Sequence, residues 1–295
     1  MAAPKPGDLS TVIALSAPAK LNLTLEVLGR RSDGYHELRS VLQTISLADR
    51  LTIEPAEDLF FVCDDPQLAG PDNLVMRAAT RLREAAEVDT GARIRLEKHI
   101  PAAGGLGGGS SDAAAALHGL SRLWGLDWGP EQLAPLAAAL GSDVPFFLWG
   151  GTALAEGRGE RITPLPPIPP LWFVLLSRAD TEPDKTRRIF SAFDPRSASD
   201  GSATERVVVG LQVGRIDPTH FVNDLMAPAR RVFGEVEALA HAVDTLGARP
   251  LLAGAGPSLF CAATSRSQAE DWAAALERQG IPALVVRPVT SQALQ

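Results

Sequence analysis

Residues 100–112 read Ile-Pro-Ala-Ala-Gly-Gly-Leu-Gly-Gly-Gly-Ser-Ser-Asp, and the alanine run Ala113 to Ala116 follows directly. Five of the six residues from Gly104 to Gly109 are glycine, which no packed core requires, because glycine loses more conformational freedom on folding than any other residue. Glycine instead offers bare backbone N–H groups. The Ser-Ser-Asp at the end suits a helix N-cap and first turn, and the alanines favour a helix. The stretch predicts a loop that opens into a helix N-terminus, which suits an anion such as phosphate.

Two common phosphate loops do not match this stretch. No lysine follows the glycines, which excludes a P-loop, and Ser110 stands where the last glycine of G-x-G-x-x-G would fall. The alternative is a flexible loop between two elements. A capped alanine helix directly after the glycines favours the phosphate loop.

Bulk properties are those of a soluble globular protein. The chain has 295 residues, enough for two domains, and a net charge of −7, which argues against nucleic-acid binding. Cys63 and Cys261 are too few for a disulfide framework or a cysteine metal site. Met1 to Ser10 lacks an apolar signal core and is expected to be disordered, and no apolar run reaches the length of a membrane span. We therefore expect a cytoplasmic protein without nucleic-acid or membrane partners, as a monomer or weak homodimer.

The first third of the chain predicts strands that flank a polar face. Lys20 to Leu28 alternates polar and apolar residues with period two, so its polar face presents Lys20, Asn22, Thr24 and Glu26. A solvated sheet face is the plain interpretation of that pattern. Asp33-Gly34 is a strong hairpin signal and presents Tyr35 beside His36. Further strands are expected over Thr11–Ala17, Leu38–Leu47 and Leu51–Ile53 (with a turn at Asp49-Arg50), Leu59–Cys63 and Ala92–Lys98.

Asp143 lies between a predicted helix, Pro130 to Leu140, and an apolar run that we interpret as a strand. Pro145 restricts the preceding residue to extended geometry, which would fix Asp143 in place. A turn-forming role for Asp143 is equally compatible with the local sequence. Other expected elements are a helix from Asp72-Asn73 to about Ala86, a strand pair over Thr152–Ile162, a proline-rich domain junction over Thr163–Pro170, a strand over Leu171–Leu176, a helix ending near Phe193, a mobile polar loop over Asp194–Glu205, a largely helical Phe221–Leu246, strands over Pro250–Ala263, a helix over Gln268–Gln279 and a strand over Ile281–Arg287.

Three separated segments together resemble the GHMP kinases, the family of galactokinase, homoserine kinase, mevalonate kinase and phosphomevalonate kinase. They are Pro18-Ala19-Lys20-Leu21-Asn22-Leu23 with Asp33-Gly34-Tyr35-His36; Gly105-Leu106-Gly107-Gly108-Gly109-Ser110-Ser111-Asp112; and Gly254-Ala255-Gly256-Pro257-Ser258. Asp-Gly-Tyr-His and Ser-Asp-Val-Pro-Phe-Phe resemble the members whose substrate is a cytidine diphosphate-linked methylerythritol. The resemblance covers about Ser16 to Val286.

This resemblance implies a two-domain α+β fold. Residues 1–168 would form the N-terminal ATP-binding domain with the glycine-rich phosphate loop, and residues 169–295 a ferredoxin-like substrate-binding domain. It also implies ATP and Mg²⁺ as co-substrates, and phosphorylation of the 2-hydroxyl of that methylerythritol in the non-mevalonate isoprenoid pathway.

Site residues follow from the resemblance, position by position. Lys20 and Asp143 match the catalytic pair, and Asp143 also faces the substrate. Asn22, Tyr35, His36 and Phe190 match the methylerythritol and cytidine pocket, with Phe190 and Tyr35 on either side of the base. ATP would be bound by Asn73 and Lys98 near the adenine, and by Pro101, Gly104, Gly105, Leu106, Gly107, Gly108, Gly109, Ser110 and Ser111, of which Ser110 or Ser111 could reach Mg²⁺.

One motif departs from the family pattern. The third segment usually reads Ser-Gly-Ser-Gly-Pro, and here Ala253 and Ala255 replace both serines. Backbone donors survive that change, but hydroxyl contacts do not. Two other functions stay open at this point: a kinase for another alcohol, such as homoserine or mevalonate, and a catalytically silent ligand sensor. Asp33-Gly34-Tyr35-His36 argues against the first, and the retained Lys20 and Asp143 argue against the second.

Overall fold

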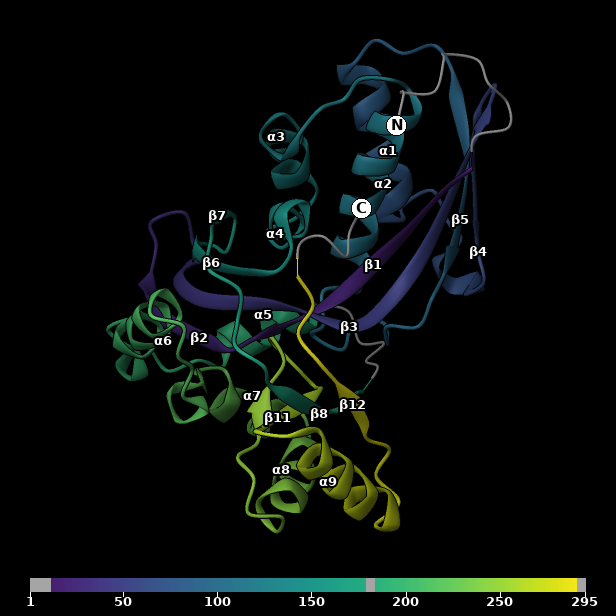
Figure 1. Ribbon diagram of the computed structural model, residues 1–295. Coiled ribbons are helices and arrows are strands. Elements are labelled where there is room, and N and C mark those ends of the chain that lie inside the picture. Colours follow the sequence, from purple (N-terminus) through teal and green to yellow (C-terminus); the bar gives the residue numbers. More distant parts are fainter. Residues whose placement is uncertain (1–11, 179–183, 291–295) are drawn as a thin grey trace.

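A computed structural model describes residues 12–178 and 184–290 of the chain. The segment Met1 to Ser10, which was expected to be disordered, lies outside the described residues. Figure 1 shows a large sheet with helices α1 to α4 on one side of it. A small sheet with helices α8 and α9 lies in the lower part of the view.

Eight strands within the described residues form the large sheet around one long strand, β3 (His36–Ala56). The first half of β3 pairs with β2 (Thr24–Arg30) and β6 (Thr152–Gly157), and its second half with β1 (Ile13–Asn22) and β5 (Gly91–Glu97). These pairings are antiparallel. The edges are β4 (Leu59–Cys63), parallel to β5, β7 (Arg161–Pro164), paired with β6, and β9 (Val222–Asn223), parallel to β2.

Four helices cover one face of this sheet: α1 (Leu74–Ala85), α2 (Gly108–Leu123), α3 (Pro130–Leu140) and α4 (Val144–Trp149). The alanine run of α2 packs against β1 and α1, because small side chains let the backbones approach closely. Ile53, Ile94 and Phe146 fill the core below it. The helix that carries the glycine loop is therefore buried along most of its length, which fixes the direction of its N-terminus.

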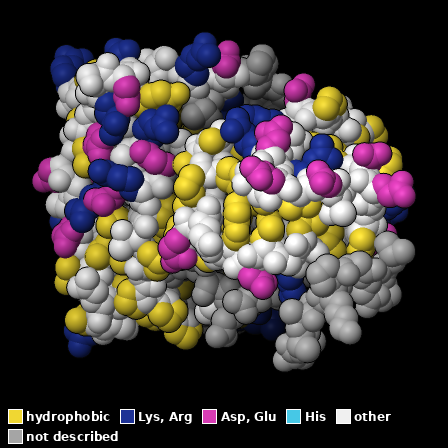
Figure 2. All heavy atoms as spheres, turned by 90° about the horizontal axis from the view of Figure 1, so that it is seen from above, with side chains coloured by type: hydrophobic (Ala, Val, Ile, Leu, Met, Phe, Trp, Pro, Cys, Tyr) yellow, Lys and Arg dark blue, Asp and Glu magenta, His cyan; other side chains and the backbone are white. Residues whose placement is uncertain are grey.

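The small sheet has the antiparallel order β10 (Leu251–Leu252), β11 (Leu259–Ala263), β8 (Trp172–Leu176) and β12 (Leu284–Val286). Around it lie α5 (Lys185–Ser191), α7 (Met226–Val232), α8 (Val236–Asp244) and α9 (Arg266–Arg278), while α6 (Ser202–Gln212) packs against β2 and β3 of the large sheet. Elsewhere in the chain, 3₁₀ turns occur at Pro66–Leu68, Pro195–Ser197 and Pro218–His220. A core that includes Leu21, Val41, Phe173 and Phe260 joins the two sheets. On the face seen in Figure 2, basic and acidic side chains are interspersed.

Three predicted elements differ from the structure. Asp49-Arg50 is not a turn, because β3 continues through it and the Asp49 carboxylate is buried. The apolar run after Asp143 is the helix α4 rather than a strand, and Pro145 sits in its first turn, where no hydrogen bond from its nitrogen is required. The predicted mobile loop Asp194–Glu205 contains a 3₁₀ turn and the start of α6.

The polar face of the first strands also differs from the simplest expectation. Lys20, Asn22, Thr24 and Glu26 are all buried rather than solvated. Glu26 accepts the N–H of Thr204 at 2.6 Å, at the start of α6. Period-two alternation predicted one strand over Lys20–Leu28, but the structure has the end of β1 and the start of β2 there, with a break at Leu23. The cover over their polar side comes from α6 and the glycine loop, far away in the sequence.

Candidate active site

The glycine loop runs up to Gly107, and α2 begins at Gly108, earlier than the predicted cap at Ser110. Gly107 is the N-cap residue with φ of 74°, and Gly105 has φ of 86°, so both adopt the left-handed conformation that favours glycine. A Cβ at Gly105 would lie 2.0 Å from the carbonyl oxygen of Ala253, so no larger residue fits. The first N–H groups of α2 lack intrahelical acceptors, which leaves them available to an anion.

The third segment packs directly against the glycine loop without serine hydroxyls at its two alanine positions. Ser258 donates its backbone N–H to the Gly104 carbonyl at 3.2 Å. The Asn223 amide donates to the carbonyls of Leu252 and Gly254, both at 2.8 Å. Lys185 of α5 donates to the Gly256 carbonyl at 2.5 Å, and its ammonium also contacts the carbonyl of Ala103. Backbone contacts and Lys185 thus hold the two loops together.

Lys20 and Asp143 lie next to each other, as the resemblance predicts for a catalytic pair. The Lys20 Nζ is 3.7 Å from Asp143 Oδ2, and the two side chains are 5% and 42% exposed. The backbone N–H of Lys20 donates to the Leu106 carbonyl at 2.9 Å, which joins β1 to the glycine loop. Asp143 occupies the N-cap position of α4, but its carboxylate makes no capping hydrogen bond. A purely local turn role therefore does not account for this side chain.

Asn22 holds the Lys20 ammonium in place. Its Oδ1 accepts from Lys20 Nζ at 2.7 Å, and its Nδ2 donates to Ser40 Oγ at 2.8 Å. Ser40 in turn donates to the Thr24 carbonyl. Asn22 lines the cleft, as expected for a substrate contact, but both ends of its amide already have protein partners. Its first task in the structure is to orient the lysine.

Aromatic side chains gather beside the hairpin between β2 and β3. His36 and Phe190 stack, with ring centroids 5.1 Å apart and 23° between their planes. Tyr35 is 55% exposed, and the Arg158 guanidinium lies 4.9 Å from its ring centroid. Burial lowers the pKa of His36, and the charge of Arg30 lowers it further, so the imidazole is neutral at pH 7. In this structure Phe190 contacts His36, while Tyr35 keeps a face open to solvent.

Asn73 and Lys98, which were predicted to lie near the adenine, have structural partners. Asn73 caps α1: its Oδ1 accepts the Val75 N–H at 2.9 Å. Lys98 contacts the Asp49 carboxylate, and its Nζ is 2.7 Å from Asp112 Oδ2. Burial acts to lower the pKa of Lys98, but Asp112 and Asp49 together hold it above its usual value. Burial raises the pKa of Asp112 to about 7.

One cleft of about 1040 Å³ brings these features together. Its lining also includes polar or charged residues that were not predicted from the sequence, among them Arg30, Ser40, Arg158 and Lys185, because no local pattern distinguishes them from ordinary surface residues. Of the predicted residues, Lys20, Asn22, Tyr35, His36, Gly105, Gly107, Ser110, Asp143 and Phe190 line the cleft, while Asn73, Lys98, Pro101, Gly104, Leu106, Gly108, Gly109 and Ser111 are not part of its lining.

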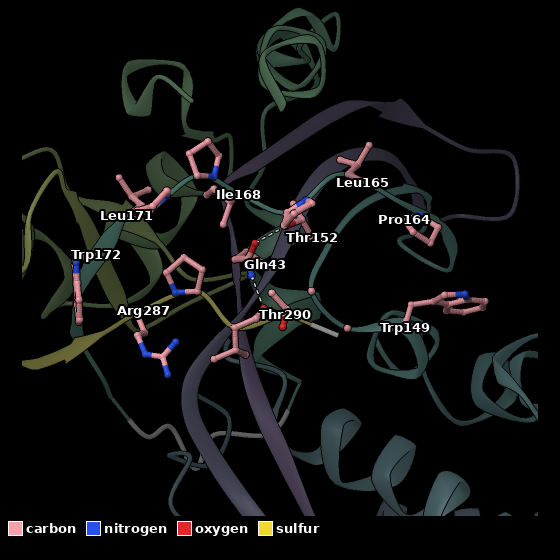
Figure 3. A pocket seen from close by; sticks show the side chains of 17 residues that line it. Gln43, Trp149, Thr152, Pro164, Leu165, Ile168, Leu171, Trp172, Arg287 and Thr290 are labelled. Atoms are coloured by element: carbon pink, nitrogen blue, oxygen red, sulfur yellow. Dashed lines mark hydrogen bonds between the residues drawn. The ribbon is translucent and has the colours of Figure 1, made fainter. Parts of the chain in front are cut away.

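A second cavity, of about 600 Å³, lies beside the proline-rich segment after β7. Figure 3 shows Gln43 bonded to Thr152 at its centre and Trp149 and Trp172 at opposite ends. Arg287 is the one charged residue that lines this cavity. None of the predicted site residues lines it. The chemistry-bearing groups therefore concentrate in the first cleft.

Neither a metal-ligand cluster nor a membrane-spanning helix occurs among the described residues. Residues 12–178 and 184–290 contain no group of three or more His, Cys, Asp and Glu side chains that could hold a metal ion. Within the same ranges, no helix is long and apolar enough to cross a membrane.

Comparisons with known proteins agree with this geometry. A profile described as "GHMP kinases N terminal domain" matches residues 73–151, which include the glycine loop and Asp143. The chain is 40% identical to a 4-diphosphocytidyl-2-C-methyl-D-erythritol kinase of Dehalococcoides mccartyi, over 88% of this chain and 92% of that protein. It is 45% identical to the kinase of that name from Symbiobacterium thermophilum, over 82% and 87%.

A solved structure extends the likeness to three dimensions. The crystal structure of a 4-(cytidine 5'-diphospho)-2C-methyl-D-erythritol kinase superimposes with a TM-score of 0.80 at 39% identity. The match covers 94% of this chain and 99% of that one. The likeness therefore extends over both sheets.

Proposed function

Because this chain belongs to the GHMP kinase family, and within it to the 4-diphosphocytidyl-2-C-methyl-D-erythritol kinases, we propose that it transfers the terminal phosphate of ATP to the 2-hydroxyl of that compound. The reaction belongs to the non-mevalonate isoprenoid pathway. The observation that carries the proposal is the position of Lys20 and Asp143, 3.7 Å apart, in one cleft with the glycine loop and the Tyr35–His36 hairpin.

Asp143 receives the acceptor hydroxyl in this proposal. Its carboxylate is partly exposed and makes no capping hydrogen bond, so it can orient the hydroxyl and accept its proton. A neighbouring cation makes a carboxylate a weaker base. That is tolerable when the transition state is loose, since the proton then leaves late. Lys20, buried and held by Asn22, supplies a fixed positive charge to the transferring phosphate.

The glycine loop and the first turn of α2 would bind the triphosphate. Their backbone N–H groups point from a helix N-terminus whose direction the buried α2 fixes. Asn73 and Lys98 are proposed near the adenine, where the third proton of the Lys98 ammonium could still donate. Contacts from Pro101, Gly104 and Leu106 would come from the loop backbone.

The residues of the first turn also fit a Mg²⁺ ion. Ser110 lines the cleft, and the buried Ser111 hydroxyl has no hydrogen-bond partner among the described residues. Mg²⁺ usually binds through one or two protein groups together with substrate phosphates, so a full protein cage is not required. When bound, the ion would neutralise charge on the phosphates. Ser110 or Ser111 would supply a hydroxyl oxygen to it.

The hairpin and α5 would bind the cytidine end. Tyr35 offers an exposed ring face for the base, Phe190 offers a second, and neutral His36 can donate or accept a hydrogen bond at the base edge. We also propose a division near residue 168, into an ATP-binding and a substrate-binding domain. The enzyme is expected to act in the cytoplasm as a monomer or weak dimer.

A coupled assay of ADP release across a panel of alcohols tests this function. The cytidine diphosphate-linked methylerythritol should support turnover, while homoserine, mevalonate and galactose should give only the background ATPase rate. Turnover with one of those alcohols instead would refute the substrate assignment. No turnover with any, by a folded protein that binds ATP, would refute the catalytic one.

A further inference from the structure

A buried cluster of two acids and one lysine lies behind the glycine loop. Asp49 comes from β3, Lys98 directly follows β5, and Asp112 comes from α2. Their side chains are 0%, 10% and 3% exposed. Lys98 contacts both carboxylates, and no residue of the proposed catalytic pair takes part.

The cluster touches the chain on both sides of the loop. Asp49 Oδ1 accepts the backbone N–H groups of His99, at 2.5 Å, and Ile100, at 2.8 Å, which directly precede the loop. Asp112 lies in α2, directly after it. A Cβ on Gly108 would lie 3.4 Å from Asp49 Oδ2, so the first turn of α2 packs closely against the same carboxylate.

Stability alone does not explain such an arrangement. Taking charges out of water is costly, and buried ion pairs are often no more stabilising than apolar side chains of similar volume. Here two carboxylates share one ammonium, so the cluster offers no net positive charge behind a helix N-terminus proposed to bind a polyanion. Attraction of phosphate is therefore not the purpose of the cluster. What it does provide is fixed geometry, because each hydrogen bond ties a different element to Lys98 or Asp49.

We propose that Asp49 and Asp112 are positioning residues for ATP. Both hold Lys98, and Asp49 also holds the His99 and Ile100 N–H groups directly, which fixes the start of the glycine loop relative to the first turn of α2. This inference rests on the proposed function, in that the loop binds the triphosphate. Neither carboxylate touches the nucleotide. Loss of either one lets the N–H groups of the loop drift from the positions that a triphosphate requires.

The test uses Asp49→Asn and Asp112→Asn, which keep side-chain shape and remove charge, in the full chain. Isothermal calorimetry should show ATP binding weakened roughly tenfold or more, because misplacement by about 1 Å is costly even when its cause is remote. Amide hydrogen exchange over residues 101–110 should accelerate. The double variant should bind ATP little worse than Asp49→Asn alone, since Asp112 acts through the lysine that Asp49 also holds.

Asp224→Asn is the matched control, because Asp224 accepts the Val27 N–H at 2.8 Å elsewhere in the large sheet. It should lower the melting temperature without changing ATP affinity or exchange in residues 101–110. The inference is overturned if the cluster variants behave like this control. If Asp49→Asn does not fold, Asp112→Asn alone decides.

Failure of the proposed function has a different signature. If wild-type protein does not bind ATP, the function fails, and hydrogen exchange in the loop still reports whether the cluster fixes its geometry. Unchanged loop exchange in both cluster variants contradicts the inference whatever the wild-type enzyme phosphorylates.

Discussion

Lys20 is the residue on which most of the site converges. Its ammonium is buried, bonded to Asn22 and adjacent to Asp143, and its backbone N–H holds the glycine loop. The would-be Cβ of Gly254 lies 2.9 Å from its Nζ, so the third segment also approaches it closely. A buried cation needs such partners, because an unpaired charge in the interior is unstable. The network that makes Lys20 tolerable in the fold also fixes it for chemistry.

The exposed ring of Tyr35 should contribute to binding of the cytidine substrate. Tyr35→Ala should raise the KM for the cytidine substrate by about tenfold, since loss of base–aromatic stacking costs about 1–2 kcal/mol. Tyr35→Phe keeps the ring and should behave like wild type. Steady-state kinetics with each substrate varied in turn provide the measurement. Equal losses for ATP and the cytidine substrate in Tyr35→Ala would place the ring outside the base pocket.

Individual site residues were predictable only where a short motif carried them. The glycines, Lys20, Asp143 and the Tyr35–His36 pair stand in recognisable local patterns. Asp49 was predicted to be a turn residue, because Asp49-Arg50 places two adjacent charged residues between apolar ones. Lys185 and Arg158 gave no signal, since their partners Gly256 and Tyr35 are far away in the sequence.

At the scale of elements, the loop conformation yields a prediction for two glycines. Gly105→Ala should destabilise the protein strongly, because φ is 86° and a Cβ would meet the Ala253 carbonyl at 2.0 Å. Gly109→Ala lies within α2, where the nearest atom would be 3.7 Å away, so it should keep or slightly raise the melting temperature. Thermal melts measure both. Similar melting temperatures for the two variants would contradict the loop geometry.

The contact between α2 and α4 predicts that the free energy of unfolding depends on pH. His118 Nε2 lies 3.1 Å from the Leu148 carbonyl, and burial lowers the pKa of this histidine below its usual 6.5. The unfolded chain then binds the proton more readily than the folded chain. The contribution of His118 to the free energy of unfolding is therefore complete above pH 6.5 and falls as the pH drops below 6.5. Between about pH 7.5 and pH 5.5, the free energy of unfolding should fall more for wild type than for His118→Gln. Parallel pH profiles in urea titrations would show that His118 does not contribute.

Elements with a clear period or cap were predicted from the sequence, while elements decided by tertiary contacts were not. The α2 helix and the β6–β7 strand pair match their expected positions closely. Val144 to Trp149 is apolar on every side, so its pattern cannot separate a buried helix from a buried strand. The start of α6 contains serines typical of a loop, but the buried Glu26 accepts its first N–H groups and stabilises the helix there.

The two sheets of the whole molecule depend on each other. β9, from the second half of the chain, pairs with β2, and the core of Leu21, Val41, Phe173 and Phe260 draws on both halves. A division near residue 168 would therefore separate two sheets that share buried surface. The proposed active-site cleft is lined from both halves of the chain, by Lys20 and Asp143 from the first and by Lys185 and Phe190 from the second.

Unfolding should accordingly occur in one cooperative transition. Loss of either sheet exposes the shared core, so neither half should persist alone in denaturant. Tryptophan fluorescence and far-UV circular dichroism should give coincident urea curves, because Trp124 and Trp149 report on the first half and Trp272 on the second. Two separated transitions would show that the halves are energetically independent.

The central claim is that Lys20 and Asp143 act together in phosphate transfer, and a double-mutant cycle on turnover tests it most directly. Asp143→Asn should lower kcat by about 10²–10⁴-fold, with ATP binding retained. Lys20→Met should also lower kcat, and the double variant should be far less impaired than the product of the two losses, because the pair works as a unit. Thermal melts establish that each variant is folded. Unchanged kcat in folded Asp143→Asn, or fully multiplicative losses in the double variant, would contradict the account.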